Sequence, residues 1–231
     1  MIKHYSAILF DLDGTLLPMD YDEFTKAYFG LLCKRFHEYD PEMLVAAIWK
    51  GTKAMITNNG TMPNEQRFWD TFAAIVGEDI RSRIDDFDNF YRTDFHKARA
   101  ITRPNPRARE IIDHARKHAD KVILATNPLF PLCAVEARLS WIGLTPEDFD
   151  WVTTYENSGY CKPNPLYYTD ILNRFSLNPA DCLMVGNDVK EDAAAASQAG
   201  LSVHLITDDL LTHGLDPAAY SCSSWDAWLE G

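Results

Sequence analysis

Two aspartates that follow a short apolar run constrain this chain more than any other feature of its sequence. Residues 7–10 are Ala-Ile-Leu-Phe, a pattern typical of a strand buried in a sheet. Asp11 and Asp13 come directly after it, and side chains at positions i and i+2 of an extended segment point to the same side. Two like charges about 4 Å apart repel by about 1 kcal/mol in water and by about 4 kcal/mol at an effective dielectric constant near 20. The sequence therefore predicts a cation or a proton that offsets the repulsion between these carboxylates.

A hairpin turn is the alternative explanation of Asp13-Gly14, because Asp-Gly often connects two antiparallel strands. That explanation leaves Asp11 unaccounted for. Pro18 and a helical pattern follow Leu17, so no partner strand comes directly after the turn. The aspartate pair is therefore better explained by a functional site than by a hairpin.

Composition and charge narrow the classes of protein that this chain can belong to. Its 231 residues allow one large domain or two smaller ones, and 46% apolar residues can build a core. A net charge of -12 makes nucleic acid and anionic membranes poor partners. Neither a signal peptide nor a membrane-spanning stretch is evident. An odd number of cysteines without a Cys-x-x-Cys pattern favours the reducing cytoplasm over disulfides or a zinc site: Cys33, Cys133, Cys161, Cys182 and Cys222.

The pattern of apolar residues divides the chain into a helical block and an alternating part. Residues 21–103 repeat with the helical period and show no strand-like alternation. Helices are expected there at about 21–36, 43–56, 63–76 and 80–91. The sequence thus predicts an α-helical insertion, residues 18–103, after the first strand.

Strands and helices alternate from Pro104 onward, which indicates right-handed crossovers and a parallel sheet. Further strands are expected at residues 121–126, 151–154, 182–186 and 201–206, with helices at 106–118, 132–144, 164–175 and 189–199. The predicted fold class is α/β, with a Rossmann-like parallel sheet in a core domain formed by residues 1–17 and 104–231.

Polar residues follow three of the predicted strands. They are Asp11 and Asp13, Thr126 and Asn127, and Asn187 and Asp188. Because the carboxyl ends of parallel strands lie along one edge of a sheet, where ligands bind, these side chains are expected to share one crevice.

These segments resemble the motifs of the haloacid dehalogenase superfamily of phosphatases and phosphotransferases. Residues 10–16, Phe-Asp-Leu-Asp-Gly-Thr-Leu, resemble its first motif, and Thr126-Asn127 is similar to the second. Lys162-Pro163 is similar to the third, and residues 186–192, Gly-Asn-Asp-Val-Lys-Glu-Asp, to the fourth. The resemblance implies the fold of that family, with residues 18–103 as its helical cap domain. It also implies the phosphatase branch, similar to phosphoglycolate phosphatases.

The resemblance also implies roles for individual residues. Asp11 would be the nucleophile that forms an aspartyl-phosphate, and Asp13 the general acid and then the base. A carboxylate at position 13 favours phosphoryl transfer, because the dehalogenase branch lacks it. Lys162 would balance the acidic charges and bind the anion, while Thr126 and the main-chain N–H of Asn127 would donate hydrogen bonds to phosphate oxygens.

Mg²⁺ is the expected cofactor, because it prefers oxygen ligands and is held by one or two carboxylates together with a substrate phosphate. Asp11, the main-chain carbonyl of Asp13 and the fourth motif would supply the ligands. Many relatives carry Asp directly after the glycine of that motif, where this chain has Asn187 and then Asp188. Either could ligate the metal, and charge favours Asp188. Asp192 would orient a metal-bound water or pair with Lys162, although helix capping is an alternative role for both aspartates.

The cap is expected to exclude water and to select the substrate. Its candidate anion contacts are Lys50, Lys53, Arg67, Arg81, Arg83 and Arg92. Its aromatic residues are interpreted as the core of the helical bundle rather than as a substrate platform: Tyr28, Trp49, Phe68, Trp69 and Phe72.

The predicted function is a Mg²⁺-dependent phosphatase of a small phosphorylated metabolite, with no nucleic-acid or membrane partner. A phosphomutase with the same two aspartates is one alternative, and a catalytically silent phosphate-binding regulatory protein is another. A nucleotide-dependent oxidoreductase is disfavoured, because no Gly-x-Gly-x-x-Gly follows the first strand. The sequence does not indicate an oligomeric state.

Overall fold

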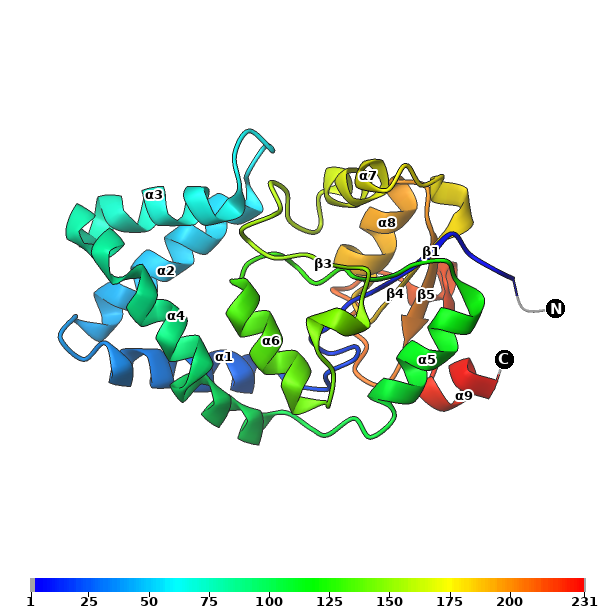
Figure 1. The fold of residues 1–231 in the computed structure, drawn as a ribbon, viewed down its shortest axis with the longest axis horizontal. Coiled ribbons are helices and arrows are strands. Elements are labelled where there is room, and N and C mark those ends of the chain that lie inside the picture. The colour runs from blue at the N-terminus through cyan, green and yellow to red at the C-terminus, as the bar shows by residue number, and fades with distance from the viewer. Residues whose placement is uncertain (1–2, 231) are drawn as a thin grey trace.

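Six parallel strands form one sheet in the order β3-β2-β1-β4-β5-β6. The structure is a computed structural model that describes residues 3–230, and the sheet lies in the right-hand half of Figure 1. The strands are β1 (Ala7–Phe10), β2 (Val122–Leu124), β3 (Trp151–Val152), β4 (Cys182–Gly186), β5 (Ser202–Ile206) and β6 (Ser221–Ser223). The direction of strand addition reverses between β1 and β4, the point at which open parallel sheets bind ligands. The predicted α/β fold class is confirmed.

The first strand is apolar because it is buried on both faces and paired on both edges. All of its residues are buried, and it lies parallel to β2 and β4, with Phe10 opposite Leu124 and Val185. Within residues 3–230, β1 has no antiparallel partner, so the hairpin explanation of Asp13-Gly14 is wrong. Gly14 instead forms a tight turn in which its N–H donates to the Leu17 carbonyl at 2.8 Å.

Helices cover both faces of the sheet. Leu9 packs on the face covered by α7 (Pro165–Arg174) and α8 (Ala195–Gln198). Ile8 and Phe10 pack on the opposite face, in an apolar cluster shared with α5 (Ala108–His118), α6 (Leu132–Trp141) and α9 (Trp225–Glu230). Figure 1 shows α7 and α8 above the sheet, and α5 and α9 below it. Successive strand residues alternate between these layers because the side-chain period of a strand is 2.

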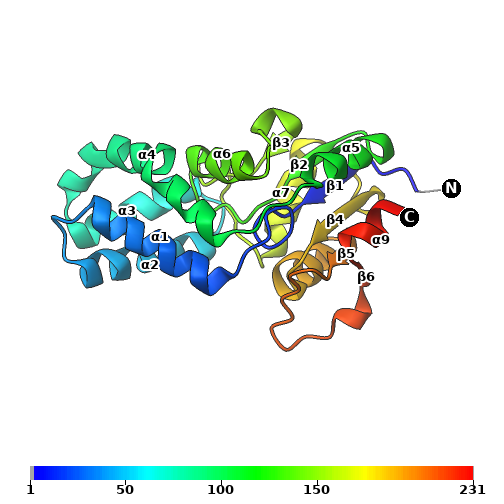
Figure 2. The same cartoon turned by 90° about the horizontal axis from the view of Figure 1, so that it is seen from below.

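The segment between β1 and α5 is helical, as the sequence predicts. It contains α1 (Tyr21–Arg35), α2 (Pro41–Ile56), α3 (Asn64–Val76) and α4 (Ile84–Arg92), with 3₁₀ segments at Glu78–Arg83 and Asp94–Ile101. Figures 1 and 2 show these helices gathered at the end opposite the sheet. Asp20 and Asp40 cap α1 and α2 by accepting hydrogen bonds from the N–H groups of Glu23 and Met43, both at 2.9 Å.

One apolar cluster joins the helical end to the sheet. The rings of Phe24 in α1 and Phe95 both pack against Trp141 of α6, with centroids 6.4 and 5.3 Å apart. The helical segment and the α/β part share buried side chains in this cluster. The helical segment is therefore packed against the α/β part. The domain boundaries at residues 17/18 and 103/104 stay a prediction.

The helix expected at residues 189–199 is only partly α-helical in the structure. Val189–Ala194 forms a π-helical turn, and regular α8 begins only at Ala195. The N–H groups of Asp192 and Ala193 both donate to the Asp188 carbonyl, at 2.9 and 3.1 Å, which widens the turn. Such π-helical turns are frequent at functional sites.

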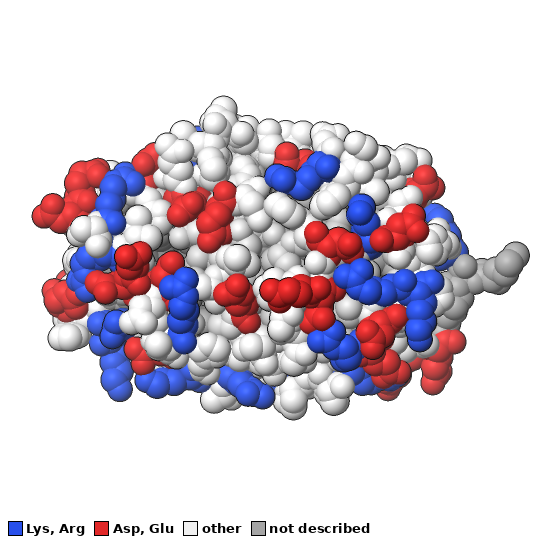
Figure 3. All heavy atoms as spheres, in the orientation of Figure 1, with Lys and Arg blue, Asp and Glu red and all other residues white. Residues whose placement is uncertain are grey.

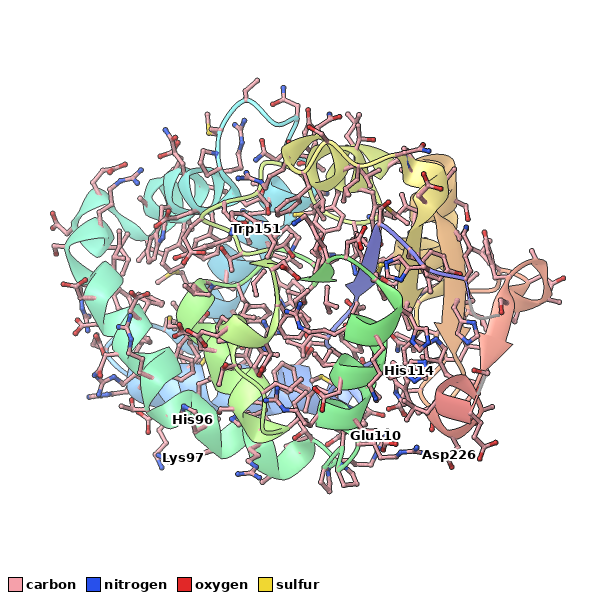
Figure 4. The ribbon with its side chains drawn as sticks, turned by 45° about the vertical axis from the view of Figure 1, so that its right-hand side comes forward. His96, Lys97, Glu110, His114, Trp151 and Asp226 are labelled. Atoms are coloured by element: carbon pink, nitrogen blue, oxygen red, sulfur yellow. The ribbon has the colours of Figure 1, made fainter. Side chains whose placement is uncertain are left out.

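The end of the chain adds a strand and a helix that the sequence does not predict. The short β6 is mostly exposed, so its sequence lacks an apolar pattern. The ring of Trp225 in α9 packs at a tilt against Phe10, with centroids 6.3 Å apart, and its indole N–H donates to the Thr15 carbonyl at 3.3 Å. Figure 4 shows Glu110 and His114 of α5 beside Asp226 of α9.

Basic and acidic side chains alternate over the molecular face drawn in Figure 3, without one large basic patch. Within residues 3–230, no helix is both long enough and apolar enough to cross a membrane. The cysteines are all free thiols: Cys33, Cys133, Cys161, Cys182 and Cys222.

Candidate active site

Asp11 lies at the carboxyl end of β1, at the point where the strand order reverses, and only 6% of its surface is exposed. Its Oδ1 accepts from the Lys162 ammonium at 2.9 Å, and its Oδ2 accepts from the Thr15 hydroxyl at 3.0 Å. The cation that the sequence requires beside the aspartate pair is thus supplied in part by a lysine 151 residues away in the chain.

Lys162 is a buried cation held between two carboxylates. Besides Asp11 it binds Asp192 Oδ1, with an N–O distance of 2.6 Å, and its side chain is 1% exposed. Burial by itself lowers the pKa of Lys162, but the negative charges of Asp11 and Asp192 outweigh burial and raise the pKa well above its usual value. The lysine is therefore held protonated inside the protein, as an anion-binding group must be.

The Asp192 carboxylate contacts the main chain just before its own helical segment. Its Oδ2 accepts from the N–H groups of Asn187 and Asp188, at 3.1 and 3.0 Å. Gly186 makes this approach possible, because a Cβ at that position would overlap the Asp192 carboxylate. Burial raises the pKa of the Asp192 carboxyl, and Lys162 opposes that shift. Asp192 consequently connects β4, its following loop and Lys162.

Asn187 and Asp188 have different surroundings. Asn187 Oδ1 lies 3.0 Å from the hydroxyl of Thr15, which is also 3.0 Å from Asp11. The Asp188 carboxylate caps the π-helical turn through the N–H groups of Lys190 and Glu191, at 2.8 and 2.7 Å. Its other oxygen lies 2.6 Å from His213 Nε2. The structure brings Asn187 next to Asp11 and gives Asp188 the capping role that the sequence offers as its alternative.

Gly14 lets Asn187 approach the first loop. Its φ of 82° lies in the left-handed region that favours glycine, and a Cβ there would overlap the Asn187 amide. The glycine is thus required both by the turn and by the close approach of the two loops.

Asp13 is buried beside an arginine that the sequence analysis missed. Arg138 of α6, 1% exposed, forms an ion pair with Asp13 Oδ2. Burial raises the pKa of Asp13 to about 6, helped by Asp11, while Arg138 and Lys162 oppose the shift. A carboxyl with that pKa exchanges a proton readily near neutral pH. Arg138 could have been suspected from the sequence, because it lies four residues after Ala134 and three before Trp141, on the apolar face of its helix.

Hydrogen bonds to the main-chain carbonyl of Thr126 hold the loop after β2 in place. The Thr126 carbonyl accepts from the hydroxyls of Thr153 and Tyr167, at 2.7 and 2.9 Å. Asn127 Nδ2 donates to Glu191 at 2.9 Å, and its Oδ1 is buried without a partner among the described residues. Thr15, Glu191 and His213 are contacts of the site to which sequence reasoning gave no role. Thr15 lies inside the first motif and Glu191 inside the fourth, whereas His213 lies outside all four motifs.

These side chains fit a hard cation that binds through oxygen. Within residues 3–230 there is no group of three or more His, Cys, Asp or Glu side chains arranged to hold a metal. The oxygen donors are instead the Asp11 carboxylate and the Asn187 amide oxygen, each 3.0 Å from the Thr15 hydroxyl. The third is the Asp13 main-chain carbonyl, which accepts from the Tyr21 hydroxyl at 3.3 Å. The buried Asp13 Oδ1 also lacks a partner among the described residues. Such a donor set suits Mg²⁺, which keeps several waters and shares its coordination with a phosphate.

A cavity of about 270 Å³ extends from Asp13 between the helices α1, α2, α3 and α4. Of its 19 lining residues, 11 are aromatic, including Tyr28, Trp49, Phe68 and Trp69. These four were expected to be bundle core only; the structure places them on the cavity wall, whereas Phe72 is fully buried in the core.

Comparison with known proteins gives one family. The model of the haloacid dehalogenase-like hydrolases matches residues 5–200. A bifunctional riboflavin kinase/FMN phosphatase of Arabidopsis thaliana is 25% identical over 205 residues, which are 87% of this chain and 48% of that protein. A ribulose-1,5-bisphosphate 5-phosphatase of Halopiger xanaduensis is 26% identical over 208 residues, 87% of this chain and 84% of that protein.

The chain spans about half the length of the plant relative. Among solved structures, the magnesium-bound HAD-hydrolase YfnB of Bacillus subtilis has a TM-score of 0.60 at 19% identity, with 99% of this chain and 98% of that chain covered. At this identity the likeness concerns the fold.

Proposed function

The chain belongs to the haloacid dehalogenase-like hydrolase family, and from this premise we propose that it is a Mg²⁺-dependent phosphatase that hydrolyses a small phosphorylated metabolite. The observation that carries the proposal is the buried contact of Asp11 with Lys162, at 2.9 Å, at the point where the strand order reverses. A carboxylate held beside a protonated lysine at that point suits attack on a phosphate. The relatives named as phosphatases support the same reaction class.

Asp11 is the proposed nucleophile. One of its oxygens attacks phosphorus, the bond to the leaving alcohol breaks, and an aspartyl-phosphate forms on Asp11. Lys162 stays paired with the carboxylate and offsets the charge of the phosphate oxygens. Thr126 and the N–H of Asn127 would donate hydrogen bonds to those oxygens, since their loop lies after the neighbouring strand β2.

Asp13 is the proposed acid and base. Its pKa of about 6 leaves a fraction of the carboxyl protonated near neutral pH, so it can give a proton to the departing alkoxide. The resulting carboxylate then takes a proton from a water that attacks the aspartyl-phosphate. Phosphate leaves, and both aspartates return to their starting states.

Mg²⁺ would be held by the Asp11 carboxylate, the Asp13 main-chain carbonyl and the Asn187 amide oxygen. When bound, the ion neutralises negative charge on the phosphate and polarises phosphorus toward attack. We favour Asn187 over Asp188 as the third ligand because the Asn187 amide oxygen shares the Thr15 hydroxyl with Asp11. The Asp188 carboxylate instead contacts the helical turn and His213. Asp192 positions Lys162 and the loop that carries Asn187. Because the cysteines are free thiols, the reducing cytoplasm is the proposed compartment.

Phosphate release from 4-nitrophenyl phosphate, with and without Mg²⁺, tests the proposal. Asp11→Asn is expected to lower turnover at least about 10³-fold, because the neutral amide is not a nucleophile. Asp22→Asn, an exposed position in the first turn of α1, is the matched control. Near-native turnover by folded Asp11→Asn would contradict the proposal.

The same assay separates the alternatives. Isomerised sugar phosphate without release of phosphate would identify a phosphomutase. Phosphate binding without turnover of any ester would identify a silent binding protein. Either result would replace the phosphatase proposal.

A further inference from the structure

The aromatic cavity beside Asp13 is the part of the molecule whose chemistry the proposed reaction leaves unexplained. A phosphatase site needs positive charge for the phosphate, and Lys162 and Arg138 provide it outside this cavity. The cavity wall carries Asp13 and Asp88 but, among the described residues, neither Lys nor Arg. A ligand group bound in this cavity is therefore not held by a Lys or Arg of the described wall.

Three arginines among the candidate anion contacts of the helical segment pair with carboxylates instead. Arg81 pairs with Asp70 and Glu78, at 2.8 and 2.7 Å. Arg83 pairs with Glu38 and Asp86, and Arg92 lies 3.5 Å from Asp88. None of these three arginines is among the described residues that line the cavity. The positions of these three arginines thus give no support to the expectation that they contact a substrate anion.

The wall instead suits an aromatic group. Tyr28, Trp69 and Phe87 are buried, and Trp49 is 51% exposed, so the wall runs from the interior to solvent. Aromatic rings bind one another in edge-to-face and offset arrangements. An apolar cavity of about 150 Å³ already admits benzene. The 270 Å³ found here gives space for one or two rings.

We propose that the substrate is the monophosphate ester of an aromatic alcohol, with no second anionic group, whose aromatic part occupies the cavity lined by Tyr28, Trp49, Phe68, Trp69, Phe87 and Phe130. This inference rests on the proposed phosphatase function and names its substrate class. A second phosphate or carboxylate would lose its hydration against the aromatic wall and lie near Asp88, with no Lys or Arg among the described lining residues to pair with it, which is strongly unfavourable. Bisphosphates and phosphoglycolate are consequently poor substrates.

Two primary alkyl esters provide the direct test. For 2-phenylethyl phosphate, kcat/KM is expected to exceed that for phosphoglycolate at least about tenfold, which is within the range that one apolar contact can discriminate. Ile56, which lines the cavity and is 40% exposed, is changed to Arg to add a cation at the wall. Ile56→Arg is expected to reduce this preference at least about threefold, by favouring the carboxylate.

Ile75→Arg is the matched control, because Ile75 is 39% exposed and is not among the lining residues. For Ile75→Arg, the ratio of kcat/KM for 2-phenylethyl phosphate to kcat/KM for phosphoglycolate should equal the wild-type ratio. Equal or faster hydrolysis of phosphoglycolate by the wild type overturns the inference, as does an equal effect of both arginine variants.

Binding of 2-phenylethanol, measured by titration calorimetry without any turnover, separates this inference from the proposed function. Saturable binding with a negative heat-capacity change is expected for the wild type, with weaker binding by Ile56→Arg. If no phosphate ester is hydrolysed but the alcohol binds in this way, the phosphatase proposal fails and the cavity assignment holds. No binding of the alcohol overturns the assignment.

Discussion

Arg138 and Asp13 form a buried ion pair between α6 and the loop after β1, across 125 residues of sequence. Each retains one polar atom, Asp13 Oδ1 and Arg138 Nη2, that is buried without a partner among the described residues. The Arg138 guanidinium also lies 4.5 Å from the centroid of the Phe130 ring, on the cavity wall. The pair thus fixes Asp13 at the junction of the phosphate site and the cavity. Asp13 Oδ1 and Arg138 Nη2 can still form hydrogen bonds with a substrate.

Removal of Arg138 is expected to destabilise the protein. Arg138→Met should lower the free energy of unfolding by about 3 kcal/mol, because loss of one partner leaves the other charge buried and uncompensated. Arg92→Met, at an exposed pair with a 3.5 Å separation, should cost no more than about 1 kcal/mol. Urea unfolding measures both.

A double variant separates the ion pair from packing. Because Asp13→Asn removes the charge that Arg138 compensates, the loss in Asp13→Asn/Arg138→Met should be smaller than the sum of the two single losses by at least about 1 kcal/mol. Additive losses would mean that Arg138 contributes only by filling space.

Alanine at Gly14 is expected to impair both folding and catalysis. Gly14 and Gly143 have φ values of 82° and 74°, so either alanine costs about 1–2 kcal/mol from the left-handed backbone. Only at Gly14 would the added Cβ meet Asn187, whereas Gly143 has no atom within 4 Å of that point. Gly14→Ala should therefore also lower turnover, by about tenfold, because displacement of a positioned ligand is costly. Turnover equally reduced in Gly143→Ala would assign the effect to backbone strain.

Substitution of Asn187 and of Asp188 is expected to have different consequences. Asn187→Ala should raise the Mg²⁺ concentration for half-maximal turnover at least about tenfold, as loss of a group at a metal site commonly does. Asp188→Ala should leave that concentration near the wild-type value and cost about 1 kcal/mol of stability through the lost cap. Phosphate release at graded Mg²⁺ concentrations, with urea unfolding, measures both effects. The reverse pattern would make Asp188 the ligand.

The pair Arg109–Asp148 is expected to make stability depend on pH in the acid range. Arg109 donates to Asp148 Oδ2 at 2.8 Å, and this contact lowers the pKa of the carboxyl. A lowered folded-state pKa adds stability above the unfolded-state value of about 3.9, and this contribution is lost as pH falls through the folded-state pKa. Asp148→Asn should therefore be less stable than the wild type at pH 7, and the difference should shrink below about pH 4. A difference independent of pH would contradict this assignment.

Most elements of the fold follow from local patterns. The buried strand at residues 7–10 has the bounds that the sequence predicts, as does β4 at residues 182–186. The helices α1 to α4 lie where the helical period occurs, because a repeating apolar face needs only neighbouring residues to specify it. The strand β6 and the π-helical turn at Val189–Ala194 were not predictable in this way, since β6 is mostly exposed and the turn depends on Asp192 reaching back to the main chain.

The sequence by itself determined that two carboxylates leave a buried strand together and need a compensating charge, because the strand period and Coulomb repulsion are local properties. Only the tertiary structure decided which groups supply it: Lys162 for Asp11 and Arg138 for Asp13, from segments far away in the chain. It also decided that Asn187, rather than Asp188, faces Asp11 through Thr15, and that the cap aromatics surround a cavity. Distances between remote side chains and the shape of an enclosed space depend on how helices and strands pack, and no periodicity in the sequence encodes them.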